Sequence, residues 1–142
     1  MSFSETISPM LGRWALSWFY GGVAMDIVYR WSSIVTQLNA KHLPLPPLLM
    51  VVALLMIVMG IVSLAFSYHT RYGAVILFGL TIAAAFGLHD FWHFADRASR
   101  DVEFDIFTRD VAICGGLLVM IGLGGGPFAL DNRIMGGGKG RR

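Results

Sequence analysis

The sequence LLMVVALLMIVMGIVSLAFSY, residues 48–68, carries no charged side chain. As an α-helix it would be about 31 Å long at about 1.5 Å per residue, close to the roughly 30 Å hydrocarbon thickness of a bilayer. Directly before it, the prolines of Leu43-Pro44-Leu45-Pro46-Pro47 interrupt any preceding helix. We therefore predict a transmembrane helix over residues 48–68.

The composition of the whole chain also indicates that much of the protein lies in lipid. Its 142 residues are 56% hydrophobic and 14% charged, and the mean hydropathy is +0.65. Soluble domains carry roughly 25% charged residues, so we predict a lipid bilayer as the main partner of this surface. The net charge of +2 is small and its positive residues are dispersed, which excludes nucleic acid as a predicted partner. The single cysteine, Cys114, allows no internal disulfide.

Three further apolar stretches accompany this segment. Ser8-Pro9 is typical of a helix start, and Gly124-Gly125-Gly126-Pro127 ends the last stretch. We predict one domain over residues 1–130, an all-α membrane protein built as a four-helix transmembrane bundle, followed by a flexible basic tail over 131–142. The predicted spans cover residues 9–29, 48–68, 72–94 and 106–123, with a loop over 30–47.

An even number of spans places the N- and C-termini on the same side of the membrane, together with the turn His69-Thr70-Arg71. Lys and Arg are slightly more numerous on that side than on the other. Cytoplasmic loops carry an excess of these residues, so we predict cytoplasmic termini.

Small residues indicate which helix faces pack. Gly79, Ala83 and Gly87 follow each other at intervals of four residues, and such stripes let helices approach closely in membranes. On the last helix Ala112 and Gly116 share a face with Arg109, whereas Asp110 shares a face with Cys114. We expect these small-residue faces to point into the bundle.

Topology gathers several polar residues at one end of the bundle. The end of the first helix, the loop 30–47, the end of the third helix and the start of the fourth all emerge there. The residues concerned are Asp26, Arg30, His42, Asp90 and Arg109. Because a guanidinium has five donors, we hypothesise that Arg109 bridges Asp26 and Asp90. In the alternative, each charge reaches water separately.

His89-Asp90-Phe91-Trp92-His93 resembles the zinc motif H-E-x-x-H. No third ligand has a diagnostic spacing, so we predict no metal site, with His89 and His93 as a weak alternative. An aromatic belt at the membrane surface is the favoured interpretation of this segment. A half-buried acid, an arginine and aromatic planes also suit a quinone headgroup, for which the candidates are Asp26, Asp90, Phe91, Trp92 and Arg109.

Five short motifs in this order resemble the DoxX family of small four-helix membrane proteins, over residues 11–131. They are Gly12-Arg13, Leu43-Pro44-Leu45-Pro46, Thr70-Arg71, His89-Asp90-Phe91-Trp92 and Phe107-x-Arg109-Asp110-x-Ala112-x-x-Gly115-Gly116-Leu117-Leu118. The chain departs from that family's pattern at Ile57, where many relatives carry an acidic residue. Arg109-Asp110 also replaces the more usual Lys-Asn pair.

The resemblance implies a multi-pass protein of the bacterial inner (plasma) membrane, related to the small subunit of thiosulfate:quinone oxidoreductase. The expected function is a membrane subunit of a quinone-linked redox complex, with a soluble or membrane oxidoreductase subunit as partner and quinone as cofactor. The alternative is a non-catalytic membrane scaffold or assembly partner of a soluble oxidoreductase. Neither interpretation assigns a catalytic residue.

Overall fold

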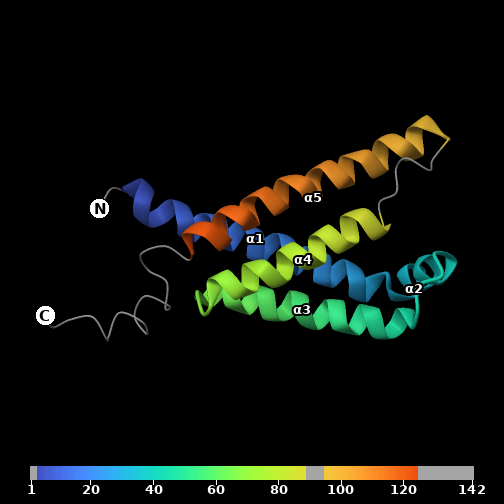
Figure 1. Ribbon diagram of the computed structural model, residues 1–142, viewed down its shortest axis with the longest axis horizontal. Coiled ribbons are helices and arrows are strands. Elements are labelled where there is room, and N and C mark those ends of the chain that lie inside the picture. Colours follow the sequence, from blue (N-terminus) through green and yellow to red (C-terminus); the bar gives the residue numbers. More distant parts are fainter. Residues whose placement is uncertain (1–2, 89–94, 125–142) are drawn as a thin grey trace, which may run out of the picture.

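The structure is a computed structural model that describes residues 3–88 and 95–124 (Figure 1). Every residue range that forms regular structure in this part of the chain is helical. The five helices are α1 (Phe3–Tyr29), α2 (Trp31–Ala40), α3 (Pro46–Phe66), α4 (Thr70–Leu88) and α5 (Arg97–Leu123). The prediction of an all-α protein is therefore confirmed for the described residues.

The four long helices run alternately in opposite directions, and α2 lies across one end of them (Figure 1). That end, here called the α2 end, also holds the end of α4 and the start of α5. The opposite end, here called the turn end, holds the start of α1, the turn between α3 and α4, and the end of α5. Along the chain α1 packs on α3, α3 on α4 and α4 on α5.

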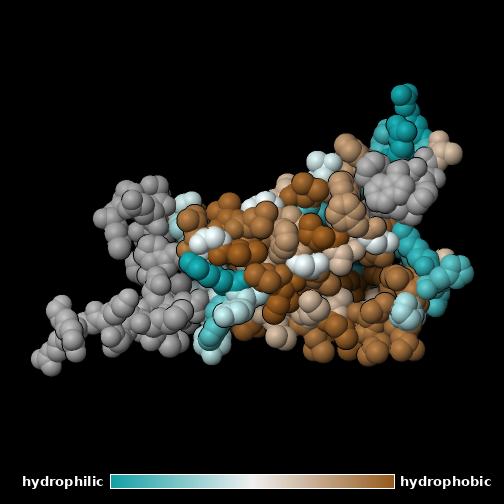
Figure 2. Space-filling model, in the orientation of Figure 1, coloured by the Kyte–Doolittle hydropathy of each residue, from teal (hydrophilic) through white to brown (hydrophobic). Residues whose placement is uncertain are grey.

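Three helices, α3, α4 and α5, are long and apolar enough to cross a membrane. The same measure of length and hydropathy does not select α1, whose sequence contains Arg13, Asp26 and several indole and phenol rings. Apolar side chains cover the middle of the molecule on the face in Figure 2, and hydrophilic ones gather toward its ends. This surface is suited to lipid, so the chain is a multi-pass membrane protein.

Helix α2 occupies much of the stretch expected to be a loop. Trp31, Ile34, Val35 and Leu38 recur at helical spacing and are buried or half-buried, while the side chains between them are exposed. These exposed residues are uncharged, and the helix is only ten residues long. A helix this short is stabilised by packing its apolar face on the bundle. Its own sequence has no pattern of charges that would predict this contact.

The turn between α3 and α4 brings these two helices very close together. Ser67 and His69 adopt left-handed φ values of 56° and 51°, and the Ser63 hydroxyl donates to the carbonyl of Tyr68 at 2.7 Å. A Cβ on Gly73 would overlap the Ser63 side chain, and one on Gly60 would overlap Leu77. Glycine at both positions therefore permits the close approach of α3 and α4.

The small-residue stripes point away from the core, which corrects the expected packing faces. Gly79, Ala83 and Gly87 are exposed on α4, as are Ala112 and Gly116 on α5. The inward residues of α4 are Thr70, Gly73, Ala74, Leu77, Thr81 and Ala85, and those of α5 are Asp110, Cys114 and Leu117. Both faces of a membrane helix are apolar, so the fit to the neighbouring helix, rather than side-chain size alone, selects the inner face.

Candidate functional site

A buried hydrogen bond joins α1 to α4 near the middle of the bundle. The Tyr20 Oη lies 2.5 Å from the Thr81 Oγ1, and the Thr81 hydroxyl donates to the carbonyl of Leu77 at 2.8 Å. Since Thr81 has one hydroxyl proton, Tyr20 is the donor to Thr81. Tyr20 also belongs to the core cluster, where it packs with Ile57 and Leu117.

Arg109 and Asp110 form an ion pair at the start of the apolar part of α5. The guanidinium Nη2 lies 3.2 Å from the Asp110 Oδ1, and the guanidinium carbon lies 5.3 Å from the centre of the Phe19 ring on α1. The Asp110 side chain is 7% exposed, whereas that of Arg109 is 53% exposed. Arg109 thus connects a buried carboxylate on α5 to an aromatic ring on α1, a contact that we call the Arg109 clamp.

The structure gives the predicted bridging arginine a different carboxylate. Asp26 pairs at 3.5 Å with Arg30, the residue between α1 and α2, and both side chains are more than half exposed. Arg109 pairs with Asp110. Asp90, Phe91 and Trp92 lie outside the described residues, so the quinone headgroup pocket remains a prediction.

The two histidines of the weak metal alternative, His89 and His93, also lie outside the described residues. Over residues 3–88 and 95–124, no three His, Cys, Asp or Glu side chains gather in a way that could hold a metal ion. Cys114 is a free, buried cysteine one helical turn after Asp110.

The α2 end contains a further polar contact, which the sequence did not indicate. Lys41, directly after α2, donates from its Nζ to the carbonyl oxygens of Gly87 at 3.2 Å and Leu88 at 2.9 Å. The last carbonyls of a helix have no partner within it, and they favour a positive charge. Lys41 therefore caps α4, although a single lysine in a polar stretch carries no local signal of such a role.

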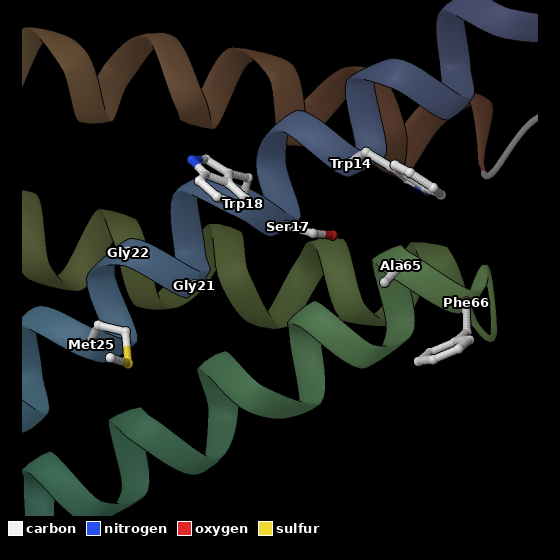
Figure 3. Close-up of a pocket in the computed structure, with 8 residues that line it drawn as sticks. All are labelled: Trp14, Ser17, Trp18, Gly21, Gly22, Met25, Ala65 and Phe66. Atoms are coloured by element: carbon white, nitrogen blue, oxygen red, sulfur yellow. The ribbon is translucent and has the colours of Figure 1, made fainter.

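An open apolar groove of about 730 Å³ lies between α1 and α3 (Figure 3). Its lining contains no charged or titratable residue and consists of Trp14, Ser17, Trp18, Gly21, Gly22, Met25, Ala65 and Phe66. A Cβ on Gly21 or Gly22 would meet no atom within 4 Å, so the groove is open at the backbone of α1. Trp18 is 86% exposed beside it. The groove offers apolar and aromatic contact without a group for acid–base chemistry.

Comparison with protein families matches residues 6–134 to the SURF4 family. No curated protein and no solved structure matches the chain. The match covers nearly the whole chain, so the chain belongs to the SURF4 family and is an integral membrane protein of that family.

The resemblance to the DoxX family is therefore wrong, because SURF4 is a different family. The motifs that carried the resemblance combine an arginine or histidine at a helix end, prolines before a helix and glycines within one. Membrane helices commonly have such residues at these places, which is why the motifs did not discriminate between families.

Proposed function

We propose that this SURF4-family chain is a non-catalytic membrane scaffold whose groove between α1 and α3 receives a transmembrane helix of a partner protein. The observation that carries the proposal is the lining of the groove, which is apolar, aromatic and glycine-rich. Ser17 and Gly21 are four residues apart within it, and paired small residues at this spacing let two membrane helices approach closely. Tryptophan is among the residue types enriched at the positions that contribute most to binding at protein interfaces.

The polar groups inside the bundle support a structural rather than a chemical role. Tyr20 is engaged with Thr81, Arg109 with Asp110, and Lys41 with the end of α4. Each of these contacts joins two helices or neutralises a charge. None of these side chains lines the groove, so the open surface and the polar groups are separate features.

The quinone-linked redox role and the bacterial inner membrane followed from the DoxX resemblance, and both lose that support with its correction. The oxidoreductase partner rested on the same resemblance and loses the same support. Of the two functions expected from the sequence, the scaffold interpretation remains. It requires an apolar surface that binds a partner protein, and it requires no cofactor.

A photoreactive amino acid at position 18 tests the groove in membranes from cells that produce the full chain. We expect one discrete protein adduct from position 18, and none from a matched probe at Leu55, which is exposed on α3. Gly22→Leu fills the groove without meeting another atom at its Cβ, so it should abolish the adduct at position 18. Equal labelling at both positions, or an adduct that persists with Gly22→Leu, would exclude the groove as the binding site.

We also propose that α1 is the fourth span, as required for a four-helix transmembrane bundle. Trp14 and Trp18 expose 61% and 86% of their surfaces along it, which suits lipid better than water. Of the three charged residues of α1, Glu5 and Asp26 lie near the two ends of the helix, where a charge costs less than at the bilayer centre, and Asp26 pairs with Arg30. In this arrangement the start of α1 and the end of α5 lie on one side, which we propose to be cytoplasmic.

Membrane-impermeant thiol reagents test this topology with single cysteines in a Cys114→Ala background. We expect Ser32→Cys and Ser99→Cys, both at the α2 end, to react from one side of the membrane and Ser8→Cys from the other. Reaction of Ser8→Cys and Ser32→Cys from the same side would show that α1 does not cross.

A further inference from the structure

The four long helices do not close into a ring with equal contacts. Backbone packing extends from α1 to α3, from α3 to α4 and from α4 to α5, but no comparable packing joins α5 to α1. The two outer helices nevertheless cross in Figure 1, and the Arg109 clamp shows that their side chains meet. The meeting of α1 and α5 is here called the seam.

Side chains of α1 and α5 meet in the core, where Tyr20 and Leu117 belong to one buried cluster. Outside this cluster the surface of α5 beside Arg109 is open, because Ala112 and Gly116 point away from the core. A Cβ on Gly116 would meet no atom within 4 Å. By contrast, α3 and α4 approach so closely that a Cβ on Gly60 or Gly73 would overlap the opposite helix. The Arg109 clamp therefore lies at the outer edge of a junction whose backbones pack less closely than those of α3 and α4.

Arg109 can also exchange the Phe19 ring for other partners. The Arg109 side chain is 53% exposed, so its guanidinium can reach water or lipid headgroups without leaving the protein surface. Asp110, which stays buried beside it, keeps the arginine at the seam. Exposed cation–aromatic contacts are weak, which makes such a contact suitable for holding two alternative arrangements in balance.

We infer that the seam between α1 and α5 is a lateral gate, held closed by the Arg109 clamp on Phe19. When Arg109 leaves the ring, α5 moves away from α1 while keeping its contact with α4. The opening exposes the buried face of the bundle, including Tyr20, to lipid or to a ligand arriving within the membrane. This inference does not depend on the groove, which lies between α1 and α3.

Distances between spin labels measure the opening directly in the full chain, reconstituted in lipid with Cys114→Ala. Labels at Ala15 and Ala112, both exposed, report on the seam, and labels at Leu55 and Val75 report on the packing of α3 with α4. We expect Arg109→Gln to increase the fraction of molecules with a long label-to-label distance at the seam by about fivefold. A change of this size corresponds to the loss of one weak cation–aromatic contact. The α3–α4 distances should not change.

Phe19→Leu removes the ring but leaves the charge pair intact and keeps an apolar side chain against the core, so it should open the seam as Arg109→Gln does. Arg109→Lys retains a cation and should have a smaller effect. Arg97→Gln, on the same helix but far from the seam, is the matched control and should have none. Unchanged seam distances in both Arg109→Gln and Phe19→Leu would overturn the gate. An equal change in the distance between the α3 and α4 labels would also overturn it, because it would indicate a general loosening of the bundle.

Discussion

The Tyr20 hydroxyl on α1 donates a hydrogen bond to the Thr81 hydroxyl on α4, 2.5 Å away. Thr81 in turn donates to the Leu77 carbonyl on its own helix. The two residues are consequently not equivalent, although they share one bond. Removing the Tyr20 hydroxyl leaves Thr81 with its intrahelical acceptor, whereas removing the Thr81 hydroxyl leaves a buried phenol without a partner.

We therefore expect Thr81→Val to destabilise the protein more than Tyr20→Phe. An unsatisfied buried polar group costs about 1–3 kcal/mol, while an interhelical hydrogen bond in a membrane protein contributes about 0.6 kcal/mol on average. Unfolding of the protein in mixed micelles gives both values. The double variant Tyr20→Phe with Thr81→Val should recover part of the loss of Thr81→Val, because neither partner is then left unsatisfied. Equal effects of the two single changes would contradict the assigned direction of the bond.

Glycine positions on α4 provide a test of which face packs. Gly73→Ala should destabilise the protein by about 1–3 kcal/mol, since the new methyl group must displace Ser63 from the turn. Gly79→Ala is the matched change on the same helix, and its Cβ meets nothing within 4 Å. It should be neutral or stabilising by up to about 1 kcal/mol, because alanine favours a helix over glycine. The same unfolding assay measures both, and a greater loss for Gly79→Ala would show that the outer stripe is a packing face.

The sequence predicted the membrane helices well where lipid imposes a strong requirement. A spanning helix must be long, apolar and internally hydrogen-bonded, and residues 48–68 meet that requirement so fully that α3 at Pro46–Phe66 lies almost where it was expected. The start of α5 at Arg97 was not anticipated, because its first turns are charged and extend beyond the apolar stretch. Hydropathy identifies the part of a helix in lipid rather than the whole helix.

The orientation of each helix around its own axis was much harder to predict. In a soluble helix the outer face is polar, but in lipid the outer face is as apolar as the inner one, so no amphipathic pattern marks the core. Arg109 and Asp110 are adjacent in sequence and about 100° apart around the helix, and only the fit of α5 to α4 and α1 selects Asp110 as the buried one. The contact of Lys41 with Leu88 spans 47 residues and has no local signature.

The cap that Lys41 provides for α4 can be removed with little change in side-chain length. Lys41→Met should speed amide hydrogen exchange in the last turn of α4 by about two- to fivefold, as expected for losing a cation at a helix C-terminus. Amides near Leu77, in the middle of α4, serve as the internal reference and should not change. Lys41→Arg retains the charge and should exchange nearly as the native protein does. If Lys41→Met and Lys41→Arg exchanged alike, the charge on residue 41 would not be what stabilises that turn.

Asp96 makes the start of α5 sensitive to acid. The backbone N–H and the hydroxyl of Ser99 donate to its Oδ2 at 3.0 and 2.9 Å, and these bonds lower the pKa of the carboxyl below its ordinary value of 3.8. Because the folded-state pKa is the lower one, the stabilisation is complete above pH 3.8 and is lost as the pH falls through the folded-state value. Exchange of the backbone amide of Ser99, corrected for its intrinsic pH dependence, should therefore rise in that acid range.

Asp96→Asn separates this titration from the cap itself. Asparagine is as good an N-cap as aspartate but does not ionise in this range. The corrected exchange of Ser99 in Asp96→Asn should stay slow and independent of pH where the native protein loses protection. Asp96→Ala should be fast at every pH, because no acceptor remains for the Ser99 amide. An acid transition of the same size in Asp96→Asn would assign the pH dependence to another carboxylate near the start of α5.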